Sequence, residues 1–137
     1  MARTYLDSGV LLACVQGDPE IGWRAVNLLS DNSRQFVSST FLQLEIIPQA
    51  VYFRRADELQ FYESFFRGVV EWALCDGLML ERGLDLACRY GLGGLDALHL
   101  RCALDLGAEN FFTMEKPSKP LFRATGIRVL SLAHWNG

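Results

Sequence analysis

The sequence predicts an α/β fold with a mainly parallel central sheet, built as a single domain over residues 1–137. Short apolar segments typical of strands alternate with longer segments of helical periodicity, and helix-start signals stand between them. This alternation is typical of parallel sheets, whose crossover connections are usually helices. A length of 137 residues suits one domain, and an apolar content of 50% is enough to fill its core.

The first third of the chain carries two predicted strands and two predicted helices. A short strand over residues 4–6 is followed by an apolar helix over residues 9–15. Asp18 provides an N-cap, with proline at the first helical position and an acid in the first turn. The second helix should therefore run from there to about residue 30. A second strand is expected at residues 35–38.

Two further helices are predicted after this strand. Thr40 and Gln43 have the spacing of a capping box and should start the first helix, while Pro48 should kink or end it. Asp57 and Glu58 open the second helix, which is rich in phenylalanine. We expect most of these rings to pack in the core, and they also suggest an apolar surface for a partner or a second subunit.

In the second half, a strand is expected within residues 69–74. Asp76 should cap a helix over residues 78–90, a glycine-rich loop follows at 91–94, and an amphipathic helix occupies residues 95–106. The remaining two strands are predicted over residues 110–113 and 127–132.

Composition excludes several classes of protein. No apolar segment is long enough for a transmembrane helix, and the N-terminus lacks the apolar run of a signal peptide, so we expect a soluble, cytoplasmic protein. Acids outnumber bases 16 to 13, unlike a protein held to nucleic acid by a basic surface. The four cysteines form no C-x-x-C pair, which argues against a zinc site, and we expect Cys14, Cys88 and Cys102 to be small core residues.

Four carboxylates are expected at the sheet edge where the carboxyl ends of the strands meet, which is where α/β sheets bind ligands. Asp7 follows the first strand, and Glu115 follows the fourth. Asp96 lies in the first turn of the helix after the glycine-rich loop. Glu45 lies about five residues past its helix start, roughly 7 Å inward at 1.5 Å per residue, so a side chain as long as glutamate is needed to reach the edge.

Three of these acids also have a purely structural explanation. Asp7 could cap the following helix, Asp96 could complement a helix dipole, and Glu115 could form a turn beside Lys116. Glu45 fits a structural explanation least well. Its helical neighbours are largely apolar, and a carboxylate on an apolar surface is costly unless something pairs with it.

Clustered carboxylates repel one another, so a site made of them requires a divalent cation. Oxygen ligands favour Mg²⁺ or Mn²⁺, which can activate water and stabilise the charge of an in-line phosphoryl displacement. Without these four acids the net charge of −3 becomes +1. The remaining surface therefore need not repel a polyanion.

Three segments resemble the PIN-domain family of metal-dependent nucleases, which includes the VapC-type toxins of bacterial toxin–antitoxin pairs. Residues 5–12 (YLDSGVLL) are similar to the family's first-strand motif with its leading acid, and Glu45 matches the helix glutamate. Residues 95–100 (LDALHL) match the common family sequence D-A-L-H-L most closely. Residues 107–116 resemble the G-A…T-x-D-K segment, and the similarity covers nearly the whole chain.

The resemblance implies a three-layer α/β/α sandwich and an endoribonuclease that depends on Mg²⁺ or Mn²⁺ and cleaves RNA. Asp7, Glu45 and Asp96 would be catalytic metal ligands, and Glu115 a fourth acid that binds metal or orients water. The family also implies an RNA substrate, frequent homodimers and, for a toxin, a cognate antitoxin protein.

The sequence departs from the family at two positions. Glu115 stands where aspartate is usual, which leaves open whether it is a true ligand, and Arg101 stands where a small residue is common. Arg101 could contact a phosphate or be a solvated arginine. His99 fits a structural or supporting role better than that of a general base, and Ser8 could bond a ligand or cap its helix. His134 falls in an expected loose tail and receives no role.

Two other functions remain as alternatives. The first is a catalytically degenerate PIN-like module that binds nucleic acid or a protein partner, with Glu115 as a mark of decay. The second is a phosphotransfer enzyme with Asp7 as nucleophile. The haloacid-dehalogenase pattern wants a second aspartate two residues later, where this chain has Gly9, so that alternative is disfavoured.

Overall fold

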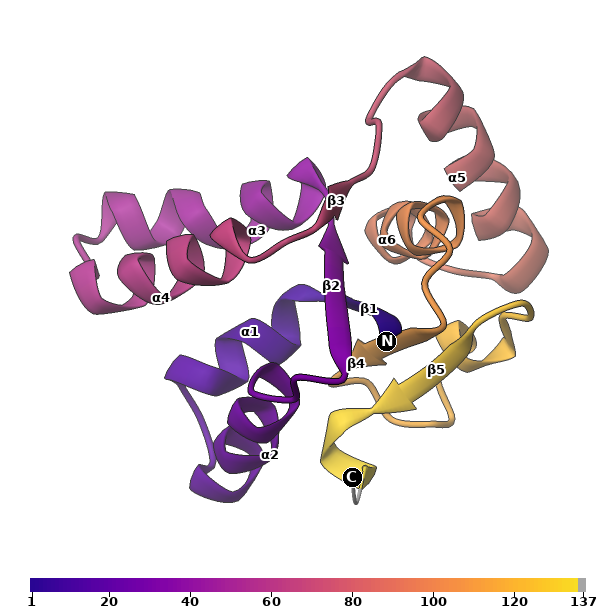
Figure 1. Ribbon diagram of the computed structural model, residues 1–137. Coiled ribbons are helices and arrows are strands. Elements are labelled where there is room, and N and C mark those ends of the chain that lie inside the picture. Colours follow the sequence, from indigo (N-terminus) through magenta and orange to yellow (C-terminus); the bar gives the residue numbers. More distant parts are fainter. Residues whose placement is uncertain (136–137) are drawn as a thin grey trace.

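A computed structural model describes residues 1–135 and contains one five-stranded sheet in which every pairing is parallel (Figure 1). The strand order is β3-β2-β1-β4-β5, with β1 at the centre. The strands are β1 (Ala2–Leu6), β2 (Arg34–Ser38), β3 (Glu71–Trp72), β4 (Asn110–Thr113) and β5 (Arg128–Ser131). The prediction of a mainly parallel α/β fold is confirmed.

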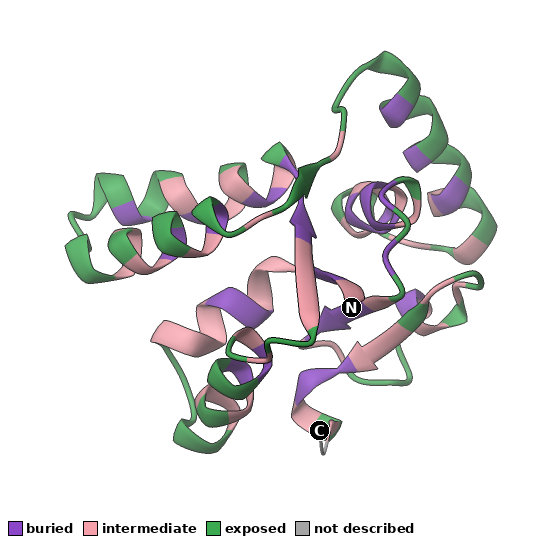
Figure 2. Cartoon of the chain, viewed as in Figure 1, coloured by how far each residue is buried: buried purple, intermediate pink, exposed green. Residues whose placement is uncertain are grey.

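Helices cover both faces of the sheet, which makes the three-layer sandwich. They are α1 (Ser8–Val15), α2 (Pro19–Leu29), α3 (Thr40–Tyr52), α4 (Ala56–Arg67), α5 (Gly77–Tyr90) and α6 (Gly94–Asp105), with short 3-10 helices η1 (Pro120–Arg123) and η2 (Leu132–His134). One buried cluster joins one face of the sheet to α1–α4, and another joins the other face to α5, α6 and η1. The buried residues accordingly lie on the inward faces of the helices (Figure 2).

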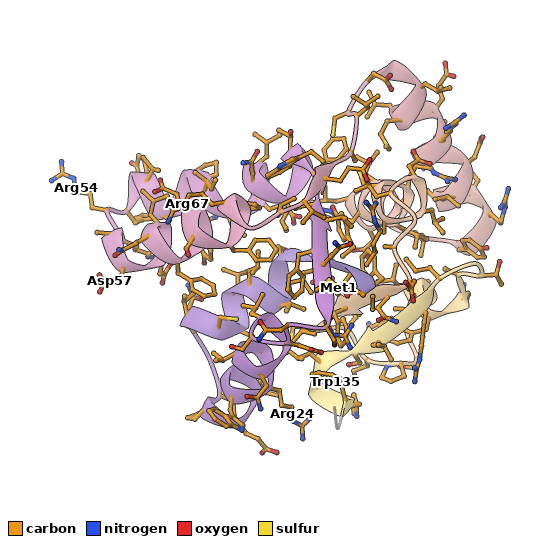
Figure 3. All side chains as sticks on the ribbon, in the orientation of Figure 1. Met1, Arg24, Arg54, Asp57, Arg67 and Trp135 are labelled. Carbon is orange, nitrogen blue, oxygen red and sulfur yellow. The ribbon has the colours of Figure 1, made fainter. Side chains whose placement is uncertain are left out.

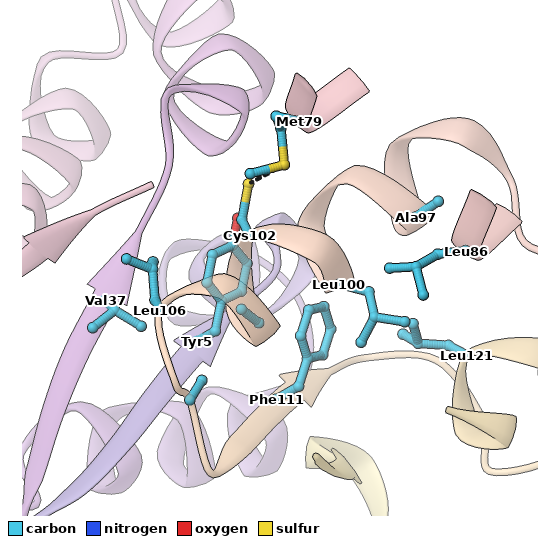
Figure 4. Close-up of a cluster of buried hydrophobic side chains, with 12 residues drawn as sticks. Tyr5, Val37, Met79, Leu86, Ala97, Leu100, Cys102, Leu106, Phe111 and Leu121 are labelled. Carbon is cyan, nitrogen blue, oxygen red and sulfur yellow. Dashed lines mark hydrogen bonds between the residues drawn. The ribbon is translucent and has the colours of Figure 1, made fainter. Parts of the chain in front are cut away.

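The central strand divides its side chains between these two cores, because successive residues of a strand point to opposite faces. Tyr5 stacks on Phe111 in the core beneath α5 and α6, with ring centroids 5.4 Å apart (Figure 4). Leu6 and Phe112 lie in the other core. Asp7 then leaves the strand at its carboxyl end, next to the N-terminus of α1.

The start of α3 differs from the predicted capping box. Ser39, not Thr40, is the N-cap residue, and its side chain makes no capping hydrogen bond. The Ser39 hydroxyl is fully buried and pairs with the hydroxyl of Tyr5 at 2.7 Å. A tertiary contact that sequence spacing does not reveal has therefore replaced the local cap.

Pro48 does not end α3, which continues to Tyr52. A proline inside a helix removes the hydrogen bond to the carbonyl four residues earlier, here that of Leu44, and its ring crowds that carbonyl. Leu44 is 65% exposed, so water can reach this side of the helix. The helix continues into an antiparallel pair with α4, from which Arg54, Asp57 and Arg67 project (Figure 3).

Three smaller expectations also change. The strand expected within residues 69–74 is only β3, a short edge strand. The C-terminal segment is packed rather than loose, since Arg24 Nη1 donates to the carbonyl of Ala133 at 2.5 Å and the Trp135 ring packs on Phe112. Cys102 is buried as expected and Cys14 is half-buried, but Cys88 is exposed on the outer face of α5.

The phenylalanines of α4 are mainly core residues. Phe66 is buried, and Phe61 and Phe65 pack against the same core. Within the described residues, no helix is long and apolar enough to cross a membrane.

Candidate active site

Asp7 lies where β1 ends and α1 begins. Its Oδ1 accepts a hydrogen bond from the Gly9 amide at 3.1 Å, so it does cap α1, and it also bonds to the Thr113 hydroxyl at the end of β4. Burial raises the pKa of Asp7 to about 6, and the nearby Asp96 charge adds to the rise, although the two hydrogen bonds and His99 oppose it. A role as helix cap does not by itself explain why Asp7 lies where burial disfavours its charged form.

Asp96 lies in the first turn of α6 and links the other acids electrostatically. Burial raises its pKa, and the charge of Glu45 raises it further, while His99 lowers it. Asp96 is also close enough to raise the pKa of Asp7 and of Glu115. Asp96 therefore lies within electrostatic reach of the other three acids at this edge of the sheet.

Glu115 follows β4 and is the most loosely held of the four. Its backbone amide donates to the Thr113 hydroxyl at 3.1 Å, which turns the chain back at the end of the strand. Burial is the largest cause of its raised pKa, the Asp96 charge adds to it, and Lys119 lowers it. The positively charged neighbour is thus Lys119, whereas the sequence suggested Lys116.

Glu45 reaches the edge from the second turn of α3, and both of its carboxylate oxygens have partners. Oε1 forms a very short hydrogen bond with Nε2 of His99, and Oε2 accepts from the Ser8 hydroxyl at 3.2 Å. The predicted need for a partner is confirmed, and the partner is a histidine that is 2% exposed. His99 accordingly has a supporting position, and Ser8 contacts an acid of the site.

Arg101 does not have the free guanidinium that the proposed phosphate contact would use. Arg101 forms a two-point pair with Asp105 one turn along α6, through Nε at 2.9 Å and Nη2 at 2.8 Å. It is therefore engaged on its own helix, as a structural arginine would be. Tyr5 and Ser39, in contrast, join the site through His99 without having been predicted. A tyrosine in the central strand was the available signal, because a buried phenol normally requires a partner.

No group of three or more histidine, cysteine, aspartate or glutamate side chains in residues 1–135 is placed to hold a metal ion. The donor chemistry does fit a hard cation, since the acids offer oxygen ligands. Burial, and after it the charge of a neighbouring acid, raises the pKa of Asp7, Asp96 and Glu115. Binding a cation would require Asp7, Asp96 and Glu115 to turn toward one point.

No family model matches the sequence, and no curated protein matches it. Solved structures do match. A chain of the Rickettsia felis VapBC2 complex, crystallised with a promoter DNA fragment, superposes with a TM-score of 0.69 at 12% identity, over 94% of this chain and 98% of that one. A chain of the DNA-bound VapBC complex of Salmonella typhimurium gives 0.66 at 19% identity, over 96% and 99%. VapC20 of Mycobacterium tuberculosis, a toxin that cleaves the sarcin-ricin loop, gives 0.60 at 15% identity, over 90% and 95%.

The chain has a PIN-domain fold of the VapC type. The likeness extends over nearly the full length of both partners in each comparison, so it concerns the whole architecture and not one shared motif. Sequence identities of 12–19% show the fold alone, and activity must be argued from the site.

Proposed function

We propose that this PIN domain is a Mg²⁺- or Mn²⁺-dependent endoribonuclease that hydrolyses RNA phosphodiester bonds. The observation that carries the proposal is the meeting of four acids from four separate segments at one edge of the sheet, three of them with raised pKa values. In residues 1–135 no lysine or arginine forms a salt bridge with any of the four. Charge that is gathered and left unneutralised fits a site for a cation better than a structural one.

Asp7, Glu45 and Asp96 are the proposed metal ligands, and Glu115 either binds metal or orients the attacking water. A bound Mg²⁺ or Mn²⁺ would supply an activated water and stabilise the charge that develops on the phosphate. Asp7 is kept at the edge by the Gly9 amide and Thr113, and Glu45 by His99 and Ser8. We propose that Lys119, whose charge lowers the pKa of Glu115, contacts an RNA phosphate.

We also propose a toxin–antitoxin role, with a cognate antitoxin as protein partner and a homodimer as the working form. The support is that similar chains come from complexes described as toxin–antitoxin or VapBC assemblies. In addition, α3 and the turn after it expose apolar side chains that a partner would cover: Leu44, Val51, Tyr52 and Phe53.

The test is cleavage of single-stranded RNA by the purified protein. We expect cutting with Mg²⁺ or Mn²⁺ and none with excess EDTA. Asp96→Asn should lower the cleavage rate at least about a hundredfold at saturating metal, the lower range for losing one strong transition-state electrostatic contact, while circular dichroism stays native.

Asp57→Asn is the matched control, because Asp57 also lies in the first turn of a helix but is exposed on α4, away from the site. It should cleave like wild type. RNA cleavage by a pure Asp96→Asn preparation at the wild-type rate would contradict the proposed ribonuclease site. Failure of the wild-type protein to cut any of a varied set of RNAs would favour the degenerate binding module instead.

A further inference from the structure

A buried chain of hydrogen bonds runs from the core to Glu45. Tyr5 Oη lies 2.7 Å from Ser39 Oγ and 2.6 Å from Nδ1 of His99, and Nε2 of the same ring contacts Glu45 Oε1. Tyr5 and Ser39 are fully buried and His99 is 2% exposed. The chain joins β1, the N-terminus of α3 and the second turn of α6, so it ties three separate segments to one carboxylate.

The chemistry of the groups sets the direction of donation. A carboxylate in its ionised form only accepts, and for that form the hydrogen between His99 and Glu45 belongs to Nε2. A neutral imidazole with Nε2–H has a lone pair on Nδ1, which accepts from the Tyr5 hydroxyl. Burial keeps that hydroxyl protonated, since it raises the pKa of Tyr5 well above its ordinary value. The oxygen of Tyr5 then accepts from Ser39, and every donor in the chain points toward Glu45.

The packing of Tyr5 does not need its hydroxyl. The ring already stacks on Phe111, as a phenylalanine would. Ser39, for its part, makes no capping bond to its own helix and is committed to Tyr5. Ser39 therefore bonds to Tyr5 in place of capping its helix, and the Tyr5 hydroxyl contacts His99 in addition to the stacking of its ring.

Glu45 keeps the capacity to bind a cation after these contacts. Each carboxylate oxygen has two lone pairs, and His99 and Ser8 use one on each oxygen. Histidine and hydroxyl donors of this kind fix the orientation of ligating side chains in metal sites. Without them Glu45 would be a flexible side chain one turn further from the edge than the other acids.

From this arrangement we infer that His99 is a positioning residue, whose Nε2–H holds the Glu45 carboxylate at the metal site, and that Tyr5 and Ser39 fix the His99 tautomer and ring orientation. This inference rests on the proposed function, because it assigns Glu45 to the metal. It adds three residues, Tyr5, Ser39 and His99, that touch neither metal nor RNA.

The experiment combines Mn²⁺ titration calorimetry with nuclear magnetic resonance of the imidazoles. The variants are His99→Leu, which removes the donor; His99→Gln, which keeps an N–H near the position of Nε2; and Tyr5→Phe, which keeps the ring. Tyr62→Phe is the matched control, because Tyr62 is equally buried but its hydroxyl bonds to no described residue and lies in α4.

We expect His99→Leu to bind Mn²⁺ about 10–100-fold more weakly, as for loss of other groups that orient metal ligands. His99→Gln should recover part of the affinity, Tyr5→Phe should lie between the two extremes, and Tyr62→Phe should match wild type. The weakening should appear mainly as a higher Mn²⁺ requirement for RNA cleavage, with the rate at saturating Mn²⁺ less affected.

The chain has two histidines, so the imidazole spectrum of the metal-free protein is simple. His99 should show the Nε2–H tautomer, and Tyr5→Phe should mix in the other one, while the exposed His134 remains unchanged.

The failures are distinguishable. If wild type neither binds Mn²⁺ nor cleaves RNA, the proposed function and this inference fall together. If wild type does both and folded Tyr5→Phe and His99 variants bind Mn²⁺ equally well, only the inference falls. Equal weakening in His99→Gln and His99→Leu would also contradict a role as hydrogen-bond donor. Should His99→Leu fail to fold, Tyr5→Phe and the tautomer decide.

Discussion

Partly buried charged groups lie at both ends of the sheet, where the strands begin and where they end. Their surroundings differ between the two ends. At the amino edge, the Arg34 side chain is 13% exposed and makes three hydrogen bonds. Its Nη1 donates to Thr4 at 3.0 Å and to Asn110 at 2.8 Å, and its Nε donates to Asp31 at 3.1 Å. At the carboxyl edge, four acids share one region with a single histidine as their close basic partner among the described residues.

Aromatic rings complete the arginine site. The guanidinium carbon lies 5.1 Å from the centre of the Phe112 ring and 5.8 Å from that of Trp135, near enough for cation–π attraction. The pKa of Asp31 is lowered, first by hydrogen bonds from Ser33 and then by Arg34. Asp31, at the amino edge, is thus stabilised in its charged form.

At the carboxyl edge, Asp7, Asp96 and Glu115 are stabilised in their neutral form instead, because burial and the charge of a neighbouring acid raise their pKa values. When these carboxyl groups are ionised, their raised pKa values lower the free energy of unfolding. The comparison teaches that the first edge is a structural device, whereas the second carries a cost that a bound cation would offset.

The largest expected effect comes from Arg34→Met. This change should lower the free energy of unfolding by about 3 kcal/mol. It removes three hydrogen bonds from a charged donor and leaves the acceptor atoms without that partner. RNA cleavage per folded molecule should stay unchanged. Urea unfolding measures the first quantity, and Arg128→Met, at an exposed position of β5, should shift it by no more than about 0.5 kcal/mol. Equal losses in both variants would show that the amino edge is not a special structural device.

A smaller effect is expected from the pH dependence of Asp7. Its folded pKa is about 6, above the ordinary value of 3.8 from which it is raised. Between these values the folded state holds the proton more tightly, so the stability of wild type should fall as pH rises through that window. The total is on the order of 2–3 kcal/mol, since one pKa unit corresponds to about 1.4 kcal/mol.

Asp7→Asn should flatten this dependence, because asparagine also caps helices but does not titrate. Urea unfolding in EDTA at several pH values from 4 to 7.5 measures the difference between the two proteins. A constant difference across the window would contradict the raised pKa of Asp7 and weaken the contrast between the edges.

Much of the fold could be predicted from local sequence. Asp18, Asp76 and the apolar runs act within a few residues, and α2, α5 and β4 begin where these signals place them. The failures arise where a distant residue competes with a local one. Ser39 bonds to Tyr5 rather than to its own helix, and the C-terminal segment is held by Arg24 and the Phe112 ring.

The same division applies to the site. Asp7, Asp96 and Glu115 were predictable because strand ends and helix starts place them, and Glu45 because an acid among apolar neighbours demands a partner. The identity of that partner was not predictable. His99 and Tyr5 are 94 residues apart in the sequence, and they meet only because α6 packs against the face of the sheet that carries Tyr5.

The central claim is that the four acids form a cation site, and thermal melts of wild type and Asp96→Asn test it most directly. Each protein is melted in EDTA and in 10–20 mM Mn²⁺ at fixed ionic strength, because salt screens surface charge. Asp57→Asn, the exposed first-turn acid of α4, serves as control.

In EDTA, Asp96→Asn should be as stable as wild type or more so, because removing one charge relieves repulsion among the acids. In Mn²⁺ the order should reverse. Wild type gains RT ln(1 + [L]/Kd), about 2.7 kcal/mol at a hundredfold excess of metal over Kd, and the variant gains less. Asp57→Asn should shift with metal as wild type does. If Asp96→Asn instead melts lower than wild type in both conditions, by the same amount and like Asp57→Asn, Asp96 is an ordinary helix-start acid and the cation site does not exist.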